Sequence, residues 1–242
     1  SIWDLAILKC SPGHFIWKRN IYTTVGTDSY RWEYGTDMIV QGDFLYLTAM
    51  VWFGNISAST QLVVNGYNSQ MNTTLPTRLQ EEGGILCKCT LEAEIVHATP
   101  LSFMSGPNTI SYYIVPSALT IYNGSIYFAA RKADKASIGK IDLNLRTNAR
   151  YMDFPSLSTD HLIYSIQGYG GNLYCSGYIS GAFGQNAYSV RDGDIFIAKL
   201  NTELVIDDIF QKASVSYETI TSSVIYENNL YTCGFSNGNL FI

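Results

Sequence analysis

The chain has 242 residues, of which 47 % are hydrophobic, 14 % aromatic and only 14 % charged, and its formal net charge is −5. Ordinary domains carry roughly a quarter charged residues, so this composition favours an ordered, β-rich fold over helices or disorder. The absence of a basic patch argues against nucleic acid as a partner, and the absence of an apolar run of roughly 18 residues argues against a membrane span.

Two kinds of short apolar segment recur along the chain. In chain order they are LAILKC (5–10), DFLYLT (43–48), ILCKCT (85–90), SIYFAA (125–130), SIGKID (137–142), NLYCSG (172–177), IFIAKL (195–200) and NLYTCG (229–234). Segments of one kind share a lysine, namely Lys9, Lys88, Lys140 and Lys199, and segments of the other kind share a tyrosine, namely Tyr46, Tyr127, Tyr174 and Tyr231. Their length and their β-branched and aromatic content predict β-strands.

A turn signal stands immediately before or at the start of each tyrosine strand. The pairs are Gly42-Asp43, Asn123-Gly124, Gly170-Gly171 and Asn228-Asn229, and residues of these types tolerate the positive φ of tight hairpins. Another apolar segment precedes each turn and a further one follows each lysine strand. The repeating unit is therefore predicted to contain four short strands.

The spacing of the lysines predicts a β-propeller. The intervals are 79, 52 and 59 residues, and an insertion at about 53–82 explains the first. Without it the period is roughly 50 residues, which fits one four-stranded propeller blade. A single four-stranded meander cannot bury both of its faces, whereas blades stacked around an axis can. A β-sandwich is the alternative, but it would not repeat four strands in a fixed order with the same side chains.

The segment GGNLYCSGYISGAFGQNAYSVRDGDIFIAKLNTEL (170–204) resembles the SBBP repeat of a seven-bladed-propeller family. ENNLYTCGFSNGNLFI at the end of the chain is similar to the first part of that repeat and WDLAILKC to its second part, while 83–145 keeps little beyond the lysines and their apolar neighbours. The resemblance implies an all-β propeller of antiparallel blades, about four in this chain, and a surface or secreted setting. It implies no activity.

The first and last segments leave two arrangements open. The chain begins with a lysine strand and ends with GNLFI (238–242), which aligns with GDIFI (193–197). Either the N-terminal strands complete a last blade begun by the C-terminal ones and close a four-bladed ring, or the chain is a window cut from a longer propeller. We expect a single propeller domain or segment over 1–242, and the second arrangement is favoured.

The loop insertion at 53–82 is the strongest candidate for recognition, because it is polar, departs from the repeat and projects from a rigid scaffold. It contains two of three N-glycosylation sequons, at Asn55 and Asn72, and the third is at Asn123 in a hairpin turn. A chain this rich in Asn, Ser and Thr produces sequons by chance as well, so either interpretation stays open.

Other polar residues favour structural roles. The lysine and tyrosine columns are expected to pack and to pair locally. RDGD (191–194) lacks the remaining ligands of a calcium loop, and the three histidines have no zinc-motif partners. Among the five cysteines, Cys10 and Cys89 occupy matching repeat positions typical of buried small side chains, and a bridge between Cys175 and Cys233 is one option.

These observations indicate no catalytic, cofactor-binding or metal-binding residues. The expected function is a non-enzymatic structural or adhesive module, extracellular or at the cell surface, whose partners are other chains or copies of itself, with glycans as a further option. A carbohydrate-binding propeller is the alternative, and a propeller enzyme acting on glycans is a third hypothesis. Repeated lectin pockets are disfavoured because Trp3, Trp17, Trp32 and Trp52 all lie in the first quarter of the chain.

Overall fold

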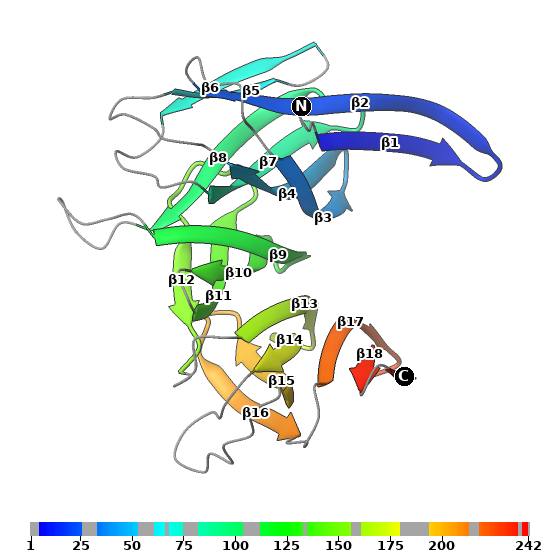
Figure 1. Ribbon diagram of the computed structural model, residues 1–242, viewed down its shortest axis with the longest axis vertical. Helices are drawn as coiled ribbons and strands as arrows, with labels where there is room; N and C mark the ends of the chain where they lie inside the picture. Colours follow the sequence, from blue (N-terminus) through cyan, green and yellow to red (C-terminus); the bar gives the residue numbers. More distant parts are fainter. Residues whose placement is uncertain are drawn as a thin grey trace. The chain divides into compact units, whose positions relative to one another are not determined.

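The structure is a computed structural model that describes residues 5–25, 33–52, 61–65, 68–74, 82–103, 112–132, 135–155, 161–179, 194–212, 218–236 and 239–241. Every regular element in these ranges is a β-strand, as the sequence predicts (Figure 1). No helix in the described ranges has the length and apolar character needed to cross a bilayer.

The strands form antiparallel sheets of four, eight, four and three strands. The eight-stranded sheet consists of two groups of four strands joined by a short pairing of Ser102 and Phe103 with Tyr113 and Tyr112. We describe these two groups separately and call the resulting five groups the first to fifth sheets in chain order. The first has the order β1(Leu5–Ser11)-β2(His14–Val25)-β5(Gln61–Asn65)-β6(Gln70–Thr74), and the second is β3(Glu33–Gln41)-β4(Phe44–Trp52)-β7(Glu82–Thr90)-β8(Ile95–Phe103). The third is β9(Tyr112–Tyr122)-β10(Ser125–Lys132)-β11(Lys135–Asp142)-β12(Arg150–Asp153), and the fourth is β13(His161–Tyr169)-β14(Asn172–Ile179)-β15(Asp194–Asn201)-β16(Ile206–Lys212). The fifth is β17(Glu218–Tyr226)-β18(Asn229–Ser236)-β19(Asn239–Phe241). The predicted order of four strands therefore repeats in the second, third and fourth sheets, whereas the first sheet combines β1 and β2 with strands of the insertion.

The chain divides into two compact units. The first is Ser1–Pro116 with Asn144–Thr147, and the second is Ser117–Leu143 with Asn148–Ile242. Each unit has its own apolar core, the first built around residues such as Leu47, Cys87 and Cys89 and the second around residues such as Tyr127, Phe154 and Phe196.

The tyrosine and lysine strands lie side by side in the second, third and fourth sheets. Tyr46 is directly opposite Lys88, Tyr127 is opposite Lys140, and Tyr174 is opposite Lys199. The two columns of the sequence are therefore cross-strand partners, repeated in the same register three times.

An irregularity also repeats in the first strand of three sheets. The register shifts by one residue between Gly35 and Asp37, between Ile163 and Ser165, and between Ile220 and Ser222. Such a bulge bends and twists a strand at a fixed point. The first strands of these three sheets therefore bend at the same position relative to the hairpin that follows.

The insertion differs from the predicted loop. Residues 61–65 and 70–74 within it form strands β5 and β6, and β5 pairs with β2. Polar sequence such as QMNTT is weak evidence for a strand, but backbone pairing with β2 supplies the hydrogen bonds that the side chains do not predict. The segment thus completes the first sheet instead of only projecting from the second.

The first and last strands of the chain belong to different sheets. In the fifth sheet the strand next to β18 is β19, through Phe235 opposite Leu240, and β1 pairs with β2 in the first sheet. No sheet of the described residues closes into a ring.

Candidate functional site

The turns that follow the lysine strands β7 and β15 share one construction. In the turns after β7 and β15, the side chain of Thr90 or Asn201 accepts hydrogen bonds from the backbone N–H groups two and four residues later, at 2.9–3.3 Å. The residue three positions after each, Ala93 and Leu204, has a positive φ of 63° and 66°, and Leu145 after β11 has 57°. These three apolar side chains are buried, so the turn is anchored on the core.

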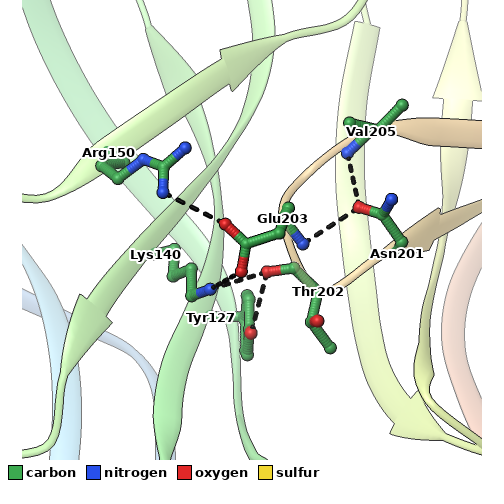
Figure 2. A network of polar contacts seen from close by, with 7 residues as sticks. All are labelled: Tyr127, Lys140, Arg150, Asn201, Thr202, Glu203 and Val205. Atoms are coloured by element: carbon green, nitrogen blue, oxygen red, sulfur yellow. Dashed lines mark hydrogen bonds and ion pairs between the residues drawn. The ribbon is translucent and has the colours of Figure 1, made fainter.

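The network at the turn between β15 and β16 is the most complete (Figure 2). Lys140 Nζ donates to the Thr202 carbonyl and to Glu203 Oε1, both at 2.8 Å, and the Tyr127 hydroxyl donates to the same carbonyl at 3.1 Å. Arg150 Nη1 lies 3.2 Å from the second oxygen of Glu203. The third sheet is thereby tied to the turn of the fourth, all within the second unit.

The same contact recurs in the first unit. Lys9 Nζ donates to Glu92 Oε1 at 2.7 Å, and Lys88 Nζ lies 3.5 Å from Asn144 Oδ1. Each acceptor is the fourth residue after the lysine of its own sheet, as Glu203 is after Lys199. The contact therefore always runs from one sheet to the same position in the turn of the next sheet along the chain. We call it the lysine–turn contact.

At two of these contacts the lysine Nζ lies over the ring of the tyrosine on the neighbouring strand. Lys140 Nζ lies 5.7 Å from the ring centroid of Tyr127, and Lys88 Nζ lies 5.6 Å from that of Tyr46 and 4.1 Å from that of Phe44. A cation over an aromatic face is stabilised when it is partly removed from water. The aromatic column thus explains how a lysine is tolerated on a strand whose other side chains are apolar.

The electrostatics follow from these bonds. The hydrogen bond from Lys140, followed by its charge, lowers the pKa of Glu203, and Arg150 adds a smaller effect in the same direction. The bond to Glu203 raises the pKa of Lys140 against the opposing effect of desolvation. In the first unit the bond from Lys9 likewise lowers the pKa of Glu92. Each lysine thus stabilises the charged form of its carboxylate partner.

A pH dependence follows from the lowered pKa of Glu203. The unfolded chain binds a proton here near pH ~4.3, whereas the folded chain does so only at lower pH, so the stabilisation is present above that value and is lost as pH falls through the folded pKa. We expect thermal unfolding to show that Glu203→Gln destabilises at neutral pH and that the difference from wild type shrinks in acid. Glu227→Gln is the control, and a difference that does not change with pH would contradict the assignment.

A second contact joins consecutive sheets at the hairpin turns. The hydroxyl of Tyr122, at the end of β9, accepts a hydrogen bond from Gly171 N at 2.6 Å, and the hydroxyl of Tyr169, at the end of β13, donates to Asn228 Oδ1. In both cases a tyrosine reaches the hairpin of the next sheet. Tyr226 occupies the same place in β17 and is exposed.

The predicted glycosylation residues are not brought together. Asn123 lies in the β9–β10 turn with a φ of 46° and is exposed, so its amide is accessible. Asn72 is in β6, opposite Val63. Asn55 lies outside the described residues, as do residues 53–60 and 75–81 of the insertion.

The cysteines correct one prediction. None of the five forms a disulfide, so the bridge between Cys175 and Cys233 that the sequence left as an option is absent. Cys89 is buried as expected, but Cys10 at the matching position is exposed. The reason is that β1 is an edge strand, with no tyrosine strand beside it among the described residues.

Thiol reactivity should follow this burial. Burial raises the pKa of Cys89 to about 12 and also raises that of Cys175, and the thiolate is the reactive form. We expect iodoacetamide to modify Cys10 first in dilute native protein and to reach Cys87, Cys89 and Cys175 only after unfolding. Peptide mass spectrometry measures the order, and early modification of Cys175 would contradict it.

Other polar candidates have local partners. Asp194, the last residue of RDGD, is the first of β15, and its buried carboxylate accepts a hydrogen bond from Gln211 Nε2 at 3.0 Å. His14 follows the β1–β2 turn, and His97 is opposite Lys88. Within the described ranges, no three His, Cys, Asp or Glu residues are grouped as a metal would need.

Sequence reasoning missed the acceptor side of the lysine–turn contact. The segments TLEAE (90–94), DLNLR (142–146) and NTELV (201–205) share a polar first residue, an acidic or amide third residue and an apolar fourth residue. This signal was available at a constant distance from each lysine.

No family model and no curated protein matches the chain.

Proposed function

We propose that this chain is a non-enzymatic interaction module, in which a β-propeller of SBBP-like repeats acts as a structural or adhesive part of an assembly, outside the cell or at its surface. The lysine–turn contact carries the proposal. It relates each of the first three sheets to the next through equivalent positions, and one constant relation between successive units generates a circular or superhelical array. Four-stranded antiparallel sheets that pack on both faces favour the circular form.

The difference between the two ends of the strands supports a scaffold role. The hairpin turns and the lysine–turn contacts lie at one end of the strands, where their polar groups bond to protein groups of the next sheet. At the other end of the strands, β14 ends at Ile179 and β15 begins at Asp194, and the sequence between these two residues is longer than a hairpin turn. A scaffold that presents loops for recognition typically has one end of its strands fixed by bonds and variable connecting segments at the opposite end.

The extracellular part of the proposal rests on the exposed Asn123 sequon and on the resemblance of the repeat. To test it, the protein in its native source is labelled on intact cells with a membrane-impermeant biotin reagent. Its mass is then measured before and after treatment with an N-glycosidase. We expect labelling and a mass that falls on treatment. An unlabelled protein without sugar would overturn the extracellular setting.

A glycan array tests the adhesive role against the carbohydrate-binding alternative. The chain is expected to bind no glycan class, because the polar groups of the lysine–turn contacts already bond to protein groups. Saturable binding to one class would replace the structural role with that of a lectin.

A further inference from the structure

The lysine–turn contact made by Lys88 differs from two others in the chemical nature of its acceptor. Lys9 and Lys140 each meet a carboxylate, that of Glu92 or Glu203, at 2.7 and 2.8 Å. Lys88 Nζ instead lies 3.5 Å from Oδ1 of a carboxamide, that of Asn144. A carboxylate forms a stable ion pair with an ammonium group, whereas a carboxamide carries a nitrogen that can leave. The contact at Lys88 therefore has a chemical option that the other two lack.

The side chain of Lys88 is enclosed by aromatic rings. The residue is 8 % exposed, and its Nζ lies 4.1 Å from the ring centroid of Phe44 and 5.6 Å from that of Tyr46. The other three lysines of the column are only partly buried. A nucleophile that is already held beside its target in a confined site avoids most of the entropy and solvent reorganisation of a bimolecular reaction. Lys88 is thus the lysine of the column best placed to act as a nucleophile.

The turn after β11 holds the carboxamide of Asn144 in front of Lys88. The next residue, Leu145, is buried and has a φ of 57°, so the backbone beside Asn144 is anchored. Because a carbonyl bond is about 1.2 Å long, the Lys88 Nζ is within about 4.7 Å of the Asn144 Cγ. A small side-chain rotation brings these atoms to the roughly 3–3.5 Å of a reactive arrangement. Asn144 is itself exposed, so a leaving group can pass into water.

We propose that Lys88 and Asn144 join spontaneously through an isopeptide bond. The Lys88 Nζ attacks the Asn144 Cγ, the C–N bond of the carboxamide breaks, and a secondary amide links the two side chains. Lys88 enters as an ammonium group and the carboxamide nitrogen leaves as an ammonium ion. Two protons move from the lysine nitrogen to the leaving nitrogen, so atoms and charge balance without an oxidant or a co-reactant.

His97 is placed to carry these protons. It is directly opposite Lys88 in the β7–β8 pair, and the side chains of directly opposite residues lie on the same face of a sheet. Imidazole both accepts and donates protons near neutral pH. In the third sheet the residue opposite Lys140 on the outer strand is Arg150, which binds Glu203 (Figure 2). The second sheet thus combines an amide acceptor with a proton carrier, where the third combines a carboxylate with a second cation.

The bond closes a covalent ring between side chains that are 56 residues apart in the chain. A link between distant residues stabilises a fold mainly by restricting the unfolded chain, as a disulfide does. This inference goes beyond the proposed function, which requires no covalent link. Its test is also separate, because the cell-surface labelling reports on the setting of the protein and peptide mapping reports on the bond.

Peptide mapping of the folded chain, produced without glycosylation, tests the bond. We expect an intact mass below that of the sequence by one molecule of ammonia. Trypsin should leave the modified Lys88 uncut and release the peptide 79–131 joined to the peptide 141–146, which contains Asn144. Cleavage after Lys88 together with a free 141–146 peptide of unchanged mass would overturn the proposal, and this result needs no variant.

Variants locate the reaction. Lys88→Arg and Asn144→Ala should each restore the full mass, whereas Lys140→Arg, which alters the corresponding contact with Glu203, should keep the loss of ammonia. Circular dichroism establishes that each variant folds. A loss of ammonia that persists in Asn144→Ala would place it at another asparagine and overturn the assignment.

The role of His97 has its own measurement. General acid–base catalysis contributes roughly 10²–10⁴-fold, so His97→Ala should slow the appearance of the joined peptides after synthesis by about 100-fold or more. Added imidazole should restore part of the rate. Joined peptides that appear as fast in His97→Ala as in wild type would overturn the assignment of proton transfer to His97.

Discussion

Replacing Tyr127 with alanine is expected to lower the free energy of unfolding by about 3–5 kcal/mol, the range for removing a large buried aromatic side chain. Tyr127 is 1 % exposed and packs in the core of the second unit. Its hydroxyl also donates to the Thr202 carbonyl. The change therefore creates a cavity and removes one bond of the lysine–turn network.

The same substitution at Tyr231 is the matched comparison. Tyr231 has the same motif position, but it is half exposed and lacks an opposite lysine, so Tyr231→Ala should cost less than about 1 kcal/mol in the dilute chain. Urea unfolding followed by circular dichroism measures both. Equal costs at the two positions would contradict the burial difference.

Tyr127→Phe separates the two contributions. It keeps the ring and removes only the hydroxyl, and the Thr202 carbonyl retains its bond from Lys140. We expect a loss of about 1 kcal/mol. A loss as large as that of Tyr127→Ala would mean that the hydroxyl, and not ring packing, dominates this position.

The strand order was predictable because it depends on local signals. Apolar segments of strand length, separated by Asn, Gly and Asp pairs, identify hairpins without knowledge of the neighbouring sheets. The pairing of Tyr127 with Lys140 follows from the same alignment. What the repeat could not predict is the environment of each copy, since Tyr46 and Tyr231 have the same motif but different neighbours in space.

The lysine–turn contact was harder to predict for a physical reason. Ala93, Leu145 and Leu204 adopt positive φ values that these residue types usually avoid, at a cost of roughly 1–2 kcal/mol each. Burial of the two leucine side chains offsets this at about 1.5–3 kcal/mol. The conformation is therefore a result of tertiary packing, which propensity rules applied to TLEAE or NTELV do not contain.

Replacing Gly177 with alanine is the second large effect that we expect, about 3 kcal/mol. Gly177 lies opposite Ile163 at the bulge of β13. A Cβ added there would lie 1.9 Å from the Leu162 carbonyl oxygen and 2.9 Å from the Ile163 Cα. Both are backbone atoms, so the clash cannot be relieved by a side-chain rotation and must shift the strand.

Gly171→Ala is the control that separates steric clash from backbone strain. Gly171 has a φ of +83° but no atom within 4 Å of an added Cβ, so its cost should be only about 1 kcal/mol. Thermal and urea unfolding of both variants measure the difference, and a Gly177→Ala variant as stable as Gly171→Ala would contradict the bulge geometry.

The second sheet shows how the position can accept a side chain, because Ala49 stands there opposite Gly35. One residue of this facing pair is glycine in the second, fourth and fifth sheets, and the bulge therefore requires a small residue on one side without fixing which strand supplies it.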